Sequence, residues 1–101
     1  MELKNMNVTV ANMATNYFEL AITTLEVIPQ TGITVAEMRA RLELKKKIEK
    51  EKEDSEKAGM IADLEASEVA LLQHCVRNCQ WRTMDKNIVA FSEYIEGIKE
   101  E

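Results

Sequence analysis

The chain has 101 residues and a net charge of −5 at pH 7, with 46% hydrophobic residues, 5% aromatic residues, three glycines and one proline. This length gives room for one domain with an aliphatic core, and so few turn-forming residues argue against β-sandwiches and barrels. No third of the chain is strongly basic, which argues against nonspecific binding to a phosphate backbone.

The N-terminal element, residues 1–31, fits two structures. Apolar residues recur every three to four positions, which predicts an amphipathic helix from Val10 to Val27. Val8 and Val10 nevertheless alternate with polar neighbours, and residues 22–28 are rich in β-branched side chains, so a strand remains the alternative. Pro29 ends the element, and a turn follows at residues 30–32.

A helix start is well marked at Thr34. The sequence Thr34-Val35-Ala36-Glu37 matches the capping box, in which the Thr hydroxyl accepts from the Glu37 amide and the Glu37 carboxylate accepts from the Thr34 amide. Ile33 and Met38 occupy the positions of a hydrophobic staple. The apolar residues then form one stripe and a second, slightly rotated one: Val35, Met38 and Leu42, then Leu44 and Ile48.

This predicted helix, residues 34–57, has a highly charged end. From Lys45 to Lys57 the only large apolar side chain is Ile48. Opposite charges three or four residues apart, such as Lys45 and Glu49, contribute about 0.2–0.5 kcal/mol each and do not hold a helix in place. The segment projects into solvent, pairs with another chain or forms a linker, and fraying is expected near Glu53 or Ser55.

The C-terminal third contains a predicted helical hairpin, residues 67–99. A short helical turn is expected at residues 60–64, after which Ser67 caps a broad-faced, central helix from Glu68 to Cys79. Asp85 caps the last helix, with Met84 and Val89 as its staple.

Two cysteines and a histidine lie close together in the sequence and could indicate a metal site. Cys75 and Cys79 share one helix face, but His74 points about 100° away from Cys75, and structural zinc sites usually need four ligands. We therefore interpret the cysteines as core residues, which leaves no metal and no cofactor in the predictions. His74 is also too far from Ser67, about 10 Å along the helix axis, to form a nucleophile and base pair, so no catalytic residue is assigned.

A tryptophan among basic residues is the best candidate site. Trp81 and Arg82 lie between the last two helices, near Arg77 and Lys86. A Trp beside arginines can anchor a protein interface or stack on a base, although it can also simply close the end of a core. We predict that these four residues, or else the charged segment from Lys45 to Lys57, bind a protein partner, with a nucleic-acid-binding regulator as an alternative.

Residues 32–44, together with the apolar positions of the two last helices and of the connection between them, resemble small helical accessory proteins of bacteriophages and prophages. These positions are Leu71, Leu72, Val76, Trp81, Ile88, Phe91, Tyr94 and Ile95. The resemblance implies a non-enzymatic role, such as an assembly factor, a virion component or an inhibitor of a host protein. It transfers no site residues.

Together these patterns predict an all-α fold, a small antiparallel bundle of three to four helices in a single domain, with an N-terminal element that is either helix or strand. The expected function is non-enzymatic protein binding, and a homo-oligomeric structural role, such as a dimer, is a further alternative. The chain has no apolar run of about 18 residues and no basic start followed by an apolar stretch. With its cysteines read as reduced thiols, it is expected to be cytoplasmic, without membrane contact.

Overall fold

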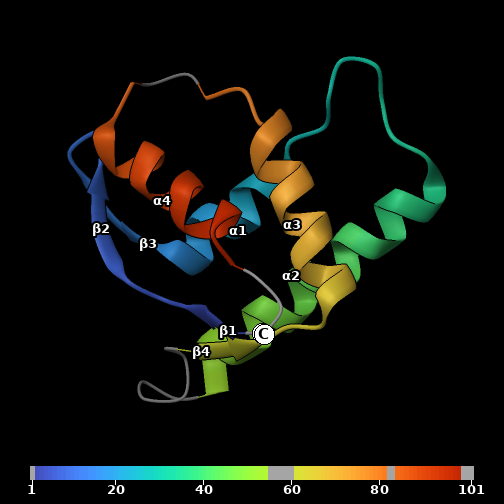
Figure 1. The fold of residues 1–101 in the computed structure, drawn as a ribbon, viewed down its shortest axis with the longest axis horizontal. Coiled ribbons are helices and arrows are strands. Elements are labelled where there is room, and N and C mark those ends of the chain that lie inside the picture. Colours follow the sequence, from blue (N-terminus) through green and yellow to red (C-terminus); the bar gives the residue numbers. More distant parts are fainter. Residues whose placement is uncertain (1, 55–60, 82–83, 99–101) are drawn as a thin grey trace.

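The computed structural model describes residues 2–54, 61–81 and 84–98, and these residues combine helices with strands (Figure 1). In chain order the elements are β1 (Glu2–Lys4), β2 (Asn7–Val10), β3 (Met13–Asn16), α1 (Tyr17–Glu26), α2 (Val35–Asp54), β4 (Ile61–Asp63), α3 (Ala66–Asn78) and α4 (Lys86–Glu96). The strands of the described residues form two antiparallel sheets of two strands each. The all-α prediction is therefore wrong, because the fold is mixed α/β.

The first correction is a β-hairpin where a helix from Val10 was predicted. Val8 of β2 pairs with Thr15 of β3, and a two-residue turn joins the strands. Its residues, Ala11 and Asn12, have φ values of 51° and 66°, as a type I′ hairpin turn requires. Along β2 the side chains alternate between exposed and half-buried. The apolar residues of this segment therefore repeat every two positions, as in a strand, and not every three to four, as in a helix.

The second correction is at residues 61–63, where a helical turn was predicted. These residues form β4, which pairs with β1 at the start of the chain. Leu3 and Ala62 face each other in this ladder and are completely buried, while Ile61 and Asp63 on either side are exposed. Burial of this one pair explains why the short segment is extended.

Helix α1 is the most buried helix, although the helix from Glu68 to Cys79 was expected to be central. Seven of its ten residues are buried, and Phe18 is completely inaccessible. The helix starts where Asn16 Oδ1 accepts from the amide of Glu19 at 2.9 Å. Its Tyr17 ring packs edge-on against Phe91 of α4, with centroids 5.1 Å apart. The core thus joins α1 to residues of every other helix and to β1 and β4.

Helix α2 begins at the predicted cap and continues into the charged segment. The Glu37 amide donates to Thr34 Oγ1 at 3.1 Å, but the Glu37 carboxylate accepts from Arg41 rather than from the Thr34 amide. Ile48 is completely buried, and Lys47 forms an ion pair with Glu68 of α3 at 2.7 Å. The described part of the charged segment is therefore helical up to Asp54, and its predicted end at residues 55–57 lies outside the described residues.

Helix α3 starts earlier than predicted. Glu65, not Ser67, is its cap, and the Glu65 amide donates to Glu68 Oε1 at 2.8 Å. The cap of α4 is Asp85, as predicted, with Oδ1 accepting from the Asn87 amide at 2.8 Å. The predicted staple beside it is wrong, because Met84 is fully exposed and Val89 is 56% exposed.

Helices α3 and α4 meet at their C-terminal ends. Arg77 Nε donates to Glu96 Oε1 at 3.0 Å. Gln73 Nε2 donates to the carbonyl oxygens of Ile95 and Ile98 at 3.1 and 3.0 Å. In a simple antiparallel hairpin the end of one helix lies beside the start of the next. Here the later part of α3 contacts the end of α4, so the two helices do not form such a hairpin.

Candidate functional site

The predicted site around Trp81 is not assembled as one surface by the described residues. Trp81 is half-buried and packs against the core, and Arg77 is hydrogen-bonded to Glu96 near the end of α4. Lys86 is exposed at the start of that helix, ten residues and about 15 Å of helix axis before Glu96. Arg82 lies outside the described residues. Arg77 and Lys86 are therefore held toward opposite ends of α4, and Trp81 has a role in the core.

The cysteines occupy positions that suit core side chains. Cys75 is buried and Cys79 is half-buried, and both are free thiols. Burial raises the pKa of both thiols, and the nearby Arg41 guanidinium opposes this only in part. Within the described residues no three His, Cys, Asp or Glu side chains are grouped so as to hold a metal ion.

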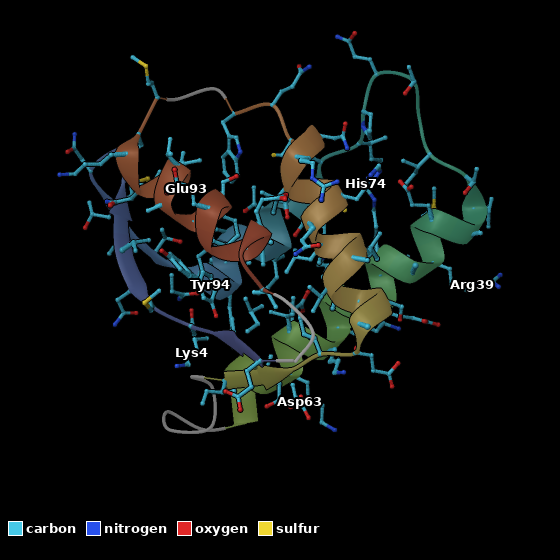
Figure 2. All side chains as sticks on the ribbon, viewed as in Figure 1. Lys4, Arg39, Asp63, His74, Glu93 and Tyr94 are labelled. Carbon is cyan, nitrogen blue, oxygen red and sulfur yellow. The ribbon has the colours of Figure 1, made fainter. Side chains whose placement is uncertain are left out.

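His74 is near a carboxylate but has an exposed position. Its Nε2 atom lies 3.9 Å from Glu37 Oε1, and the side chain is half exposed. Figure 2 shows His74 on α3. A histidine so open to solvent and so loosely paired resembles a surface residue more than a positioned general base.

A different site is a groove of about 240 Å³ between the end of α1 and the first half of α2. Its walls are mainly apolar and include three charged side chains, and its lining residues are Leu25, Glu26, Ile28, Ile33, Met38, Arg41, Leu42 and Lys45. In Figure 1 this part of the molecule lies at the right, where the chain leaves α1 and returns as α2. The groove is therefore built from two helices and the connection between them.

Of the nine large apolar side chains that are exposed among the described residues, three line this groove and a fourth, Val35, lies on the same face of α2. Val35, Met38 and Leu42 of α2 are 69%, 43% and 51% exposed, and Ile28 of the connection is 58% exposed. At about 100° per residue, the three α2 side chains fall within one sector of the helix about 60° wide. We name these four residues, Ile28, Val35, Met38 and Leu42, the apolar stripe.

The core of α2 uses its other face. Leu44 and Ile48 are buried at 1% and 0% exposure, about 100° or more around the helix from the centre of the apolar stripe. The two stripes in the sequence were the signal for this site, although the second was expected to be only slightly rotated from the first and is in fact on another face of the helix. They indicate two separate faces, of which one packs against α1 and the other remains at the surface.

Arg41 forms the base of the groove and fixes its geometry. Its side chain is 4% exposed, with Nη1 donating to the Val27 carbonyl oxygen at 2.8 Å and Nη2 donating to Glu37 Oε2 at 2.9 Å. A second bond from Nη1 reaches the Leu25 carbonyl oxygen at 3.4 Å. The Nε atom is buried without a hydrogen-bond partner among the described residues. These bonds join the last turn of α1 to α2, so both walls are held by one side chain.

Comparisons of the chain with protein-family models, curated proteins and solved structures give no match. Among the described helices, none has the length and apolar character needed to span a membrane. The functional argument therefore rests on the geometry of the groove.

Proposed function

We propose that this protein is non-enzymatic and acts by binding a helical segment of another protein in the groove between α1 and α2. The observation that carries the proposal is the apolar stripe, with four large apolar side chains exposed on one surface. Isolated exposed apolar residues are common, but a contiguous group beside a groove is typical of interaction sites.

The shape of the stripe favours a helical ligand. Val35, Met38 and Leu42 are spaced by three and four residues, so they run for about two helical turns, or about 10 Å, along α2. A partner helix laid beside them presents its own side chains at a matching spacing, as in other helix-in-groove complexes. The Arg41 bonds to Val27 and Glu37 support this proposal, because a pre-formed groove costs less ordering entropy on binding.

The nucleic-acid alternative has less support from the same geometry. It relied on Arg77, Arg82 and Lys86 acting together. Arg77 already shares its charge with Glu96, and Lys86 is about a full length of α4 away from that pair. We therefore place the proposed contact surface on the apolar stripe rather than around Trp81.

The experiment is affinity capture from cell lysates, with mass spectrometry, using the wild type and two matched variants. Leu42→Gln removes an apolar side chain of the stripe, and Val89→Gln removes a similarly exposed one, 51% against 56%, on α4. We expect one protein to be retained near one-to-one by the wild type and Val89→Gln and to be lost with Leu42→Gln.

Two results contradict the proposal. One is retention of the same protein by Leu42→Gln at wild-type level. The other is a requirement for Trp81 and Lys86 instead, shown by loss of the captured protein in Trp81→Ala and Lys86→Glu but not in Leu42→Gln. Circular dichroism of each variant confirms that the fold is kept.

A further inference from the structure

We propose that the partner segment bound by this groove is an acidic amphipathic helix, an inference that rests on the proposed function. The apolar stripe accounts for the apolar face of that helix. The charges beside the stripe determine what its flanking residues must be.

The outer edge of the stripe is basic. At about 100° per residue, Lys46 and Arg39 lie about 20° and 40° around α2 from Val35, on the side away from the groove. Both side chains are exposed, and neither forms an ion pair within the described part of the chain. Figure 2 shows Arg39 extending from α2 away from the rest of the molecule. Two exposed cations that have no ion-pair partner among the described residues therefore follow the stripe for about two turns.

The inner edge adds a third cation, which is weakly paired. Lys45 Nζ lies 3.5 Å from Glu26 Oε1 and 3.7 Å from Glu49 Oε1, both too long for strong hydrogen bonds. The nearest acid on the outer edge, Glu43, is about 40° farther from Val35 than Arg39 is. Lys45 is therefore balanced by two carboxylates on the inner edge, and the basic character beside the stripe is confined to Arg39 and Lys46 on the outer edge.

Charge complementarity favours an acidic helix over a second copy of this chain. A two-fold contact of the stripe with itself, centred near Met38, brings Arg39 of one copy next to Arg39 of the other. Like charges in an interface oppose association. A helix with Glu or Asp beside its apolar positions instead gives Arg39 and Lys46 ion-pair partners, which they do not have among the described residues.

The test is a selection from a displayed library of helical peptides against the intact protein. Every peptide carries Leu on one face at three- and four-residue spacing, and the flanking positions are randomised among Glu, Lys and Gln. Binders are kept only if they fail to bind Leu42→Gln and still bind Val89→Gln. We expect these binders to be enriched in Glu at the flanks.

A charge reversal then tests the cause of any enrichment. The double variant Arg39→Glu, Lys46→Glu is expected to weaken binding of the selected Glu-rich peptide by roughly tenfold or more, and to favour the same peptide with Lys at its flanks. Lys86→Glu, an exposed basic residue outside the groove, is the matched control and is expected to leave both affinities unchanged. Binding of the Glu-rich peptide is also expected to weaken with added salt.

The outcomes separate this inference from the proposed function. Stripe-dependent binders with Lys or Gln at the flanks overturn the acidic-helix inference and leave the groove as a helix-binding site. A library that yields no binder dependent on Leu42 contradicts both. If Leu42-dependent self-association is detected by analytical ultracentrifugation at the concentrations used, the occupant is a second copy and the inference is wrong.

Discussion

Arg41 of α2 donates a hydrogen bond of 2.8 Å to the backbone carbonyl oxygen of Val27, the residue that ends α1. The last carbonyl groups of a helix have no partners within the helix, and Arg41 supplies donors to two of them from the neighbouring helix. The same side chain accounts for the position of Glu37 and for the base of the groove. One buried cation thus connects the packing of the fold to the proposed binding surface.

We predict that Arg41→Met destabilises the protein by about 2 kcal/mol, because it leaves buried backbone acceptors and Glu37 without their donor. Urea unfolding followed by far-ultraviolet circular dichroism measures the change. Arg39→Met is the matched control, since Arg39 is exposed on the same helix, and we expect it to stay within about 0.5 kcal/mol of the wild type. Equal unfolding free energies for the two variants would show that the Arg41 hydrogen bonds do not stabilise the folded protein.

Helix starts could be predicted from the sequence where the capping side chain and the amide that it binds are close together in the sequence. Thr34 and Asp85 were identified because their side chains bond to amides only two or three residues away. The strands were not predicted because their pairing partners are distant in the sequence or because the turn that joins them lacks the usual residues. Leu3 and Ala62 pair across almost 60 residues, and the Ala11-Asn12 turn lacks the glycine that usually marks such a hairpin.

The candidate site was missed for a related reason. Both rotated stripes of α2 contain large apolar residues, and the sequence does not say which of them faces α1. The structure buries Leu44 and Ile48 and leaves Met38 and Leu42 at the surface. Only the contact between α1 and α2, with Arg41 reaching the end of α1, decides between them.

Ala11 has a left-handed backbone conformation in the hairpin turn, and this conformation is less favourable for alanine than for some other residues. Its φ of 51° is unfavourable for alanine, whereas asparagine enters this region more readily. We predict that Ala11→Asn raises the free energy of unfolding by about 0.5 kcal/mol. Ala14→Asn, an exposed alanine within β3, is the control and is expected to be neutral or destabilising. A lower stability for Ala11→Asn than for Ala14→Asn would contradict this account of the turn.

Asp85 is expected to make the protein sensitive to acid. Hydrogen bonds from the Ala11 amide and then the Asn87 amide, aided by Lys86, lower the pKa of the Asp85 carboxyl below its ordinary value of 3.8. A carboxyl with a lowered pKa in the folded state adds stability above its unfolded pKa, and this stability is lost as the pH falls through the folded pKa. We predict that Asp85→Asn loses less stability than the wild type between pH about 5 and the acid limit. Parallel stability curves for the two proteins, measured by thermal unfolding at each pH, would exclude this role.

The two cysteines should react slowly and in a fixed order in the folded protein. Burial raises the pKa of the Cys75 and Cys79 thiols, so little of the reactive thiolate forms near neutral pH, and Cys75 is the less accessible of the two. We expect iodoacetamide to modify Cys79 before Cys75, and both more slowly than in denaturant, as measured by mass spectrometry of digested samples. Cys75→Ser and Cys79→Ser identify the residue behind each rate. If Cys75 in the folded protein reacted as fast as in denaturant, its thiolate would have to be stabilised and accessible, and the interpretation of these cysteines as inert core residues would be wrong.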